Sequence, residues 1–201
     1  MRTLILGLTA AAFLSGCGGG GAPVEAENTG PWDLKGKESS ILYTTVKNNS
    51  IAETNSFSLF SGEVSNGGDV QIDIALNSVR TNIDTRDERM KKFVFKTVDY
   101  PSAVINATLP MAEFSALTTG ERKFIVDEIT VALAGKTASF ETQFLVTRLG
   151  ANKVLVESAI PIMVEADDFD LGAGVDKLQE LAKLDSITPV VPVTFSLVFK
   201  R

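Results

Sequence analysis

The stretch Val70-Gln71-Ile72-Asp73-Ile74-Ala75-Leu76 carries a bulky apolar side chain at every second position. A period of two places the aliphatic side chains on one face of a β-strand and Gln71 and Asp73 on the other. Residues 70–76 are therefore expected to form a strand with one face buried and the other in water. The same period recurs along most of the chain, and it indicates an all-β protein.

Further strands follow the same pattern. Apolar residues alternate over 129–133 and 140–146, and Val193, Phe195, Leu197 and Phe199 share one face of a strand over 190–199. Strands are also predicted over 57–64 and 154–164, and in the first of these Phe57 and Leu59 share a face opposite Phe60. Glycine-containing turns at 66–69, 135–136 and 150–152 are expected to join neighbouring strands into hairpins.

Two segments depart from the strand period. Residues 86–95, charged and then aromatic, predict a short helix, and residues 174–184 have apolar side chains at helical spacing before Pro189. Many strands of similar length with little helix favour an antiparallel barrel or a sandwich. Composition does not choose between these two architectures.

The start of the chain predicts an export signal that ends at its single cysteine, Cys17. Arg2 precedes an apolar core over 4–14 that is too short to cross a bilayer as a mature helix, which needs ~20 residues. The run Leu14-Ser15-Gly16-Cys17 resembles a bacterial lipobox, in which the cysteine is lipidated and becomes the new N-terminus. The alternative is an ordinary signal peptide followed by one stray cysteine.

The lipobox implies three parts of the chain: a signal peptide over 1–16, lipidated Cys17 with a glycine-rich flexible tether to residue 31, and a domain over 32–201. Acylation would hold the domain stably on a membrane, on the periplasmic side of a bacterial envelope. Gly18 favours the outer membrane, because an aspartate there would resemble an inner-membrane retention signal.

The amino-acid composition excludes several classes of catalytic and metal site. The chain has no histidine among its 201 residues, so histidine-based nucleophile systems and histidine-ligated metal sites are impossible. Its net charge of −6 argues against nucleic acid as a partner. Asp167, Asp168 and Asp170 lack the spacing of an EF-hand, so an acidic turn is favoured over a calcium site. No metal, cofactor or catalytic residue is predicted.

The segment 77–101 carries a family resemblance. It contains an Asn77-Ser78-Val79 strand end, an Arg86-Asp87 helix start, the Phe93-Val94-Phe95 pair and Tyr100-Pro101. In this order and spacing it resembles the YceI-like family of periplasmic, lipocalin-like proteins, and the resemblance spans roughly 32–199. The family often carries histidines where Lys47 and Arg89 stand here, so any function that needs those histidines is in doubt.

The resemblance implies an extended eight-stranded antiparallel barrel, lipocalin-like, around a long apolar tunnel that binds a polyisoprenoid such as a quinone tail. Barrels of this size can hold one small ligand. The aromatic residues expected to line the tunnel are Phe57, Phe93, Phe95, Tyr100, Phe140, Phe144 and Phe169. For each one the ordinary alternative is a place in a packed core.

Arg86 and Asp87 could hold a polar headgroup at the tunnel mouth. The competing interpretation is a helix start in which Arg86 clamps a carboxylate or carbonyls. The function expected is non-enzymatic carriage of an isoprenoid lipid. The main alternative is an interaction module whose barrel is filled by its own side chains, with Phe140 and Phe144 as plugs; an enzyme is the weakest interpretation. Family members can dimerise, and the sequence does not identify an interface.

Overall fold

The structure, a computed structural model, describes residues 30–201. The predicted signal peptide, Cys17 and most of the tether lie outside the described residues. No helix within 30–201 is long and apolar enough to span a bilayer.

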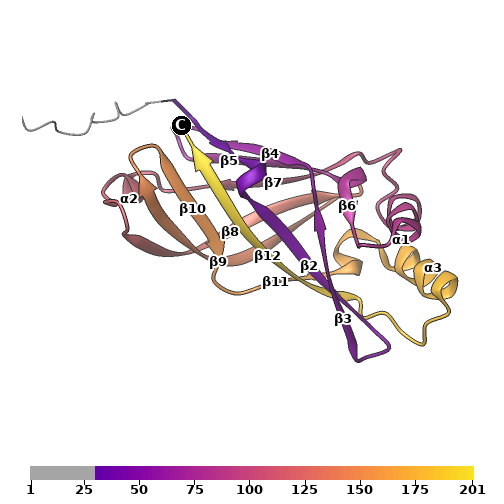
Figure 1. Ribbon diagram of the computed structural model, residues 1–201. Coiled ribbons are helices and arrows are strands. Elements are labelled where there is room, and N and C mark those ends of the chain that lie inside the picture. Colours follow the sequence, from indigo (N-terminus) through magenta and orange to yellow (C-terminus); the bar gives the residue numbers. More distant parts are fainter. Residues whose placement is uncertain (1–29) are drawn as a thin grey trace, which may run out of the picture.

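The strands combine into eight long antiparallel segments that follow one another in chain order (Figure 1). Several segments are interrupted by a short break, so that two numbered strands lie end to end. The segments are β1 (Trp32–Leu34) with β2 (Ser40–Lys47), β3 (Ile51–Phe57) with β4 (Phe60–Val64), β5 (Asp69–Ala75) with β6 (Val79–Arg80), β7 (Ser102–Thr108), β8 (Arg122–Leu133), β9 (Lys136–Gly150), β10 (Lys153–Ser158) with β11 (Ile162–Glu165), and β12 (Val190–Lys200).

The last segment closes the sheet into a barrel. One edge of β12 pairs with β1 and β2, and the other pairs with β10 and β11. Closure satisfies the backbone groups that an open sandwich would leave along its edge strands. The structure therefore confirms the predicted eight-stranded antiparallel barrel.

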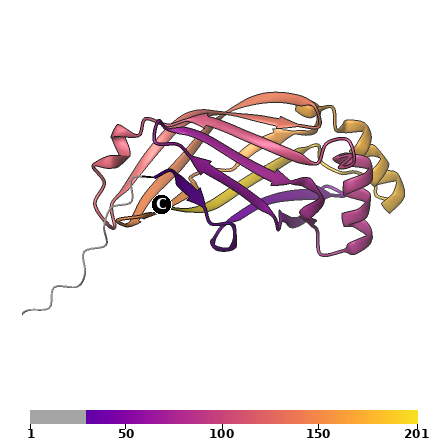
Figure 2. The ribbon, with the colours of Figure 1, turned by 90° about the horizontal axis from the view of Figure 1, so that it is seen from above.

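Helices lie at the two ends of the elongated barrel (Figure 2). The capped end carries α1 (Asp84–Arg89), the π-helix η3 (Met90–Val94), the 3-10 helix η4 (Ala166–Phe169) and α3 (Gly172–Ala182). The opposite end, here the terminal end, carries α2 (Ala112–Ser115) together with Trp32 and Arg201. Two further 3-10 turns are η1 (Gly36–Glu38) and η2 (Leu76–Ser78).

The predicted helices and turns are present. The helix expected over 86–95 corresponds to α1 and η3, and the one over 174–184 corresponds to α3. Gly174 lets α3 approach η3 closely, because a Cβ at this position would lie 2.4 Å from the carbonyl oxygen of Phe93. The β8–β9 hairpin turns through Ala134 and Gly135, which have φ values of 50° and 80°, as a two-residue turn of type I′ requires.

Two predicted strands are broken. The prediction that Phe57 and Leu59 share a face is wrong, because β3 ends at Phe57 and β4 begins at Phe60. Between them the amides of Ser58 and Leu59 bond to the carbonyl and the hydroxyl oxygen of Ser78, and Leu59 is left 62% exposed. The strand expected over 154–164 is likewise divided into β10 and β11.

Candidate functional site

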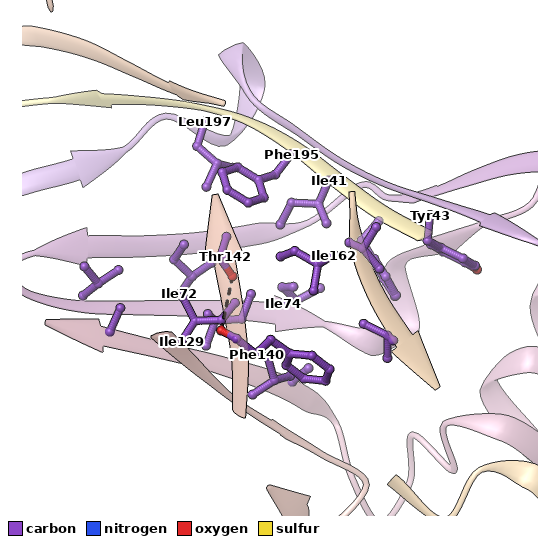
Figure 3. Close-up of a pocket in the computed structure, with 18 of the residues that line it drawn as sticks. Ile41, Tyr43, Ile72, Ile74, Ile129, Phe140, Thr142, Ile162, Phe195 and Leu197 are labelled. Carbon is purple, nitrogen blue, oxygen red and sulfur yellow. Dashed lines mark hydrogen bonds between the residues drawn. The ribbon is translucent and has the colours of Figure 1, made fainter. Parts of the chain in front are cut away.

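A continuous cavity of about 590 Å³ runs through the barrel. Every one of the eight strand segments contributes side chains to its wall, and in Figure 3 residues from distant parts of the chain point into a shared space. Ile72 and Ile74 of β5 line it, while Gln71 and Asp73 do not, as the period of two predicted. This volume falls within the range of small-molecule binding sites.

The middle of the cavity offers almost no hydrogen-bonding group. Its wall there is aliphatic or aromatic, with Thr142 as the polar exception. The Thr142 hydroxyl donates to the carbonyl oxygen of Phe140 at 3.4 Å, so its proton is already used (Figure 3). An apolar chain would fit this wall without leaving a buried polar group unpaired.

The barrel is hollow. Phe140 and Phe144, expected as plugs if side chains filled the barrel, instead form part of the cavity wall. Phe140 packs against Phe169, with ring centroids 6.2 Å apart, near the capped end. The interpretation of a barrel filled by its own side chains therefore loses its structural basis.

Five of the seven aromatic residues predicted to line a tunnel do line the cavity: Phe57, Phe95, Phe140, Phe144 and Phe169. Phe93 and Tyr100 do not. The cavity also uses residues that sequence analysis did not single out, among them Trp32, Tyr43, Arg148 and Arg201.

The π-helix explains the error at Phe93. In η3 the amide of Phe95 bonds to the carbonyl of Met90, an i→i+5 step that widens the turn. This turn brings Phe95 beside Met90 on the cavity side, and both are buried. Phe93 instead lies beneath the Lys92 ammonium group, which is 5.2 Å from its ring centroid.

Tyr100 lies outside the cavity because it packs at the β8–β9 turn. Its ring atom Cε1 is 3.0 Å from the position a Cβ of Gly135 would take. The residue is 37% exposed. It therefore covers the hairpin from the outside, and the glycine makes room for its ring.

Arg86 and Asp87 do not line the cavity, and both bond to other parts of the protein, although Arg86 Nε is buried without a hydrogen-bond partner among residues 30–201. The Arg86 guanidinium donates to Glu53 Oε2 and to the Thr81 carbonyl, each at 2.5 Å. Buried Asp87 accepts from the amide and the hydroxyl of Thr81, at 2.8 and 2.5 Å. The two residues fasten α1 to the barrel, in agreement with the competing interpretation of a helix start in which Arg86 clamps a carboxylate and a carbonyl.

Lys47 joins the same cluster through an ion pair of 2.9 Å with Glu53. Partial burial opposes ionisation of Glu53, but hydrogen bonds from Lys47 and Arg86 outweigh it and lower the pKa of that carboxyl. Arg89 caps the end of α3 by donating to the Leu181 carbonyl at 3.5 Å. Both residues that stand at the family's histidine positions thus have structural partners.

The acidic turn is also engaged by the protein. Asp168 accepts from the amide of Glu165 in a capping box, and Asp170 pairs with Lys136 at 2.7 Å. Residues 30–201 contain no cluster of three or more Asp, Glu or Cys side chains arranged to hold a metal ion. Within this part of the chain, the acidic residues stabilise the connection between β11 and α3.

Tyr43 places a phenol in the cavity wall near the capped end. Its ring packs on Phe57 with centroids 5.5 Å apart, and its hydroxyl is buried without a hydrogen-bond partner among the described residues. Burial, with a smaller contribution from the Asp87 carboxylate, raises the pKa of the Tyr43 hydroxyl well above its ordinary value. The neutral phenol is therefore the form that the folded barrel favours.

We expect the Tyr43→Phe variant to lose less stability at high pH than the wild type. The unfolded chain releases the tyrosine proton near pH 10 and the folded chain retains it, so wild-type stability falls above pH 10, by at most about 1.4 kcal/mol per pH unit from this group. Urea unfolding at pH 8, 10 and 11 measures the free energy of unfolding of both proteins. The control is Tyr100→Phe, which removes a phenol that is 37% exposed. Equal alkaline losses in wild type and Tyr43→Phe would contradict the assignment.

The terminal end of the cavity is polar and cationic. The Arg201 guanidinium carbon lies 4.4 Å from the Trp32 ring centroid, and that of Arg148 lies 5.3 Å from it. Both arginines and Trp32 line the cavity, as do Asn66 and Ser115 at the same end. No sequence signal marked these residues, because β1, β9 and the end of β12 meet only in the closed barrel.

The barrel wall also divides near the terminal end. β7 and β8 pair only between Val104–Asn106 and Thr130–Ala132, and beyond this they separate. A second hollow lies in the gap, with Leu109 in its wall and also in that of the main cavity. Phe124 and Val126, each about half exposed, line the gap on the β8 side.

Comparison with known proteins identifies the fold. A family model described as the YceI-like domain matches residues 32–199, almost the whole barrel. The chain belongs to the YceI-like family. No curated protein matches the chain.

Two solved structures resemble this YceI-like barrel. A polyisoprenoid-binding domain from Saccharophagus degradans, implicated in plant cell wall breakdown, is 33% identical, with a TM-score of 0.82; the match covers 84% of this chain and 97% of that one. BcnA of Burkholderia cenocepacia is 16% identical, with a TM-score of 0.63 over 82% of this chain and 98% of that one. The second likeness concerns the fold alone.

Proposed function

We propose that the protein binds a long apolar lipid, a polyisoprenoid or an isoprenoid quinone, and carries it without chemical change. The observation that carries this proposal is the continuous apolar cavity through the barrel. The polyisoprenoid-binding domain from Saccharophagus degradans, at 33% identity, supports the choice of ligand class. At about −0.3 kcal/mol per heavy atom, a forty-carbon chain would gain roughly −12 kcal/mol, near nanomolar affinity.

The proposed setting is the periplasmic side of a bacterial envelope, with the barrel anchored through a lipid on Cys17 and the outer membrane favoured. The lipobox-like run that ends at Cys17 supports this proposal. Two or more acyl chains suffice for stable anchoring, so the barrel itself remains available for cargo. Mass spectrometry of the mature N-terminal peptide tests the anchor, and an unmodified Cys17 would contradict it.

Native mass spectrometry tests the cargo. The full chain with Cys17→Ser, which blocks acylation, would be purified from the bacterial envelope without detergent. We expect an added mass in an isoprenoid series that disappears on organic extraction and returns when isoprenoid is added back. A clean mass, together with no uptake of added isoprenoid alcohol or quinone, would overturn the proposed function.

A further inference from the structure

One edge of β8 has no strand beside it over most of its length. The other edge pairs with β9 along the whole of β8, whereas β7 pairs with this edge only from Thr130 to Ala132. Within residues 30–201 no further strand pairs with β8. Residues 122–129 therefore present a row of main-chain amides and carbonyls without a β-ladder partner on this side.

The outer face of this edge carries two large apolar side chains. Phe124 and Val126 are 51% and 52% exposed and line the second hollow, which has a volume of about 520 Å³. Natural sheets protect exposed edges with proline, bulges or charges. Residues 122–129 include no proline or glycine, and their charges lie at the two ends of the segment rather than over its middle. The edge thus has the features of a surface that another strand covers.

The sequence of the edge is complementary to itself in the antiparallel direction. From residue 122 it reads Arg-Lys-Phe-Ile-Val-Asp-Glu, with basic residues at one end and acidic residues at the other. A two-fold axis at Ile125 would place Arg122 opposite Glu128 of a second copy, and Phe124 opposite Val126 of that copy. These four side chains are exposed, and strand alternation puts them on the same face of β8. Opposite charges and aromatic–β-branched pairs stabilise neighbouring antiparallel strands.

Neighbouring registers do not offer the same match. An axis at Phe124 would place Arg122 opposite Val126, and an axis at Val126 would place Phe124 opposite Glu128. Both registers keep the outer faces of the two strands together, but both put a charge opposite an apolar side chain. The order of charged and apolar residues therefore specifies one register, centred on Ile125.

Arg122 and Glu128 are available for such pairing. Neither forms an ion pair with another residue of the described barrel. Glu128 lies directly opposite Glu141 of β9, where like charges repel, and an arginine from a second copy would offset that repulsion. Lys123 already pairs with Glu113 of α2, so the interface does not require it.

We propose that two copies of the chain associate through their β8 edges, antiparallel about a two-fold axis at Ile125. The two barrels then share a continuous sheet across the contact, and the backbone of each β8 supplies the partners that the other lacks. The contact uses the outer face and edge of one strand, so it does not depend on the proposed lipid binding. An interface of this size is small, and we expect a dissociation constant of about 10 μM.

Sedimentation velocity measures this association in the full chain with Cys17→Ser, which prevents both acylation and a disulfide between copies. Concentrations from about tenfold below to tenfold above the expected dissociation constant would be compared. Arg122→Glu and Glu128→Arg each put like charges across the axis, and each is expected to weaken dimerisation about tenfold or more. Lys37→Glu reverses an exposed charge in η1 and is the control, which should dimerise as the wild type does.

A mixture of the two reversed variants tests the register. In the proposed pairing, each glutamate of Arg122→Glu meets an arginine of Glu128→Arg. An equimolar mixture is therefore expected to form a heterodimer at concentrations where neither variant dimerises alone. The double variant Arg122→Glu/Glu128→Arg exchanges the two charges within one chain, and it should recover the association of the wild type.

Each outcome decides for or against the interface. Dimerisation of the wild type, its loss in both single variants and its recovery in the mixture would support it. A chain that stays monomeric at every concentration overturns the proposal and leaves the edge to an extended segment of another protein. A dimer that forms as tightly in both single variants as in the wild type also overturns it, because the contact then lies elsewhere on the barrel.

Discussion

The Ala107→Trp variant is expected to lose isoprenoid binding while its barrel remains folded. Ala107 lies on β7 opposite Val70, and both residues face the cavity. An indole at this position would project into the tunnel between the arginine pair and the aliphatic middle. Because the indole would occupy space that the tail needs, an extended tail could not pass it. We expect a loss of at least about 100-fold in affinity, or about 2.7 kcal/mol.

Ala132→Trp is the matched control for this experiment. Ala132 lies on β8 between Val131 and Leu133, which line the cavity, whereas Ala132 does not. The indole would therefore lie on the outer face of the barrel. Native mass spectrometry with added geranylgeraniol measures binding, and circular dichroism confirms folding. Unchanged binding by folded Ala107→Trp would show that the tail does not occupy the tunnel.

The Asp87→Ala variant is expected to lose stability and to keep its affinity for lipid. In the native barrel Asp87 Oδ1 accepts from the Thr81 amide at 2.8 Å and from the Thr81 hydroxyl at 2.5 Å. Removal of the carboxylate leaves both buried donors without this acceptor. Hydrogen bonds to a charged group contribute about 1.5–3 kcal/mol each, and the Thr81 hydroxyl can still donate to Ile83, so we expect a loss of about 3 kcal/mol. Urea unfolding measures this loss.

The control for Asp87 comes from the same helix. Asp84→Ala removes an exposed carboxylate from the first turn of α1 and should cost no more than about 1 kcal/mol. Lipid binding by the folded fraction of Asp87→Ala distinguishes the two roles considered for this residue. A stable Asp87→Ala variant that binds lipid weakly would restore the headgroup role at the capped end.

Local sequence was enough to predict most of the elements. The alternation around Ile72 and Ile74 predicted a strand, and the glycine at 135 predicted the hairpin that the structure contains. Both signals depend on residues adjacent in the chain, because strand geometry and turn dihedrals are local properties. The break at 58–59 was not predicted, because it depends on hydrogen bonds to Ser78, which is distant in sequence. The π-helix η3 was not predicted either, because no local pattern in 86–95 marks its widened turn.

The sequence by itself determined the apolar face of strands such as β5 and β9, and hence the places of Ile72, Phe140 and Phe144 in the cavity wall. Only the tertiary structure decided that the barrel is hollow, since this depends on how far apart the closed walls hold their side chains. It also decided which arginines face the cavity. Arg86 resembles a headgroup contact in sequence but pairs with Glu53, whereas Arg148 and Arg201 meet at Trp32 only when β12 closes on β1. Charge partners distant in sequence become neighbours through strand pairing, so a local pattern does not reveal them.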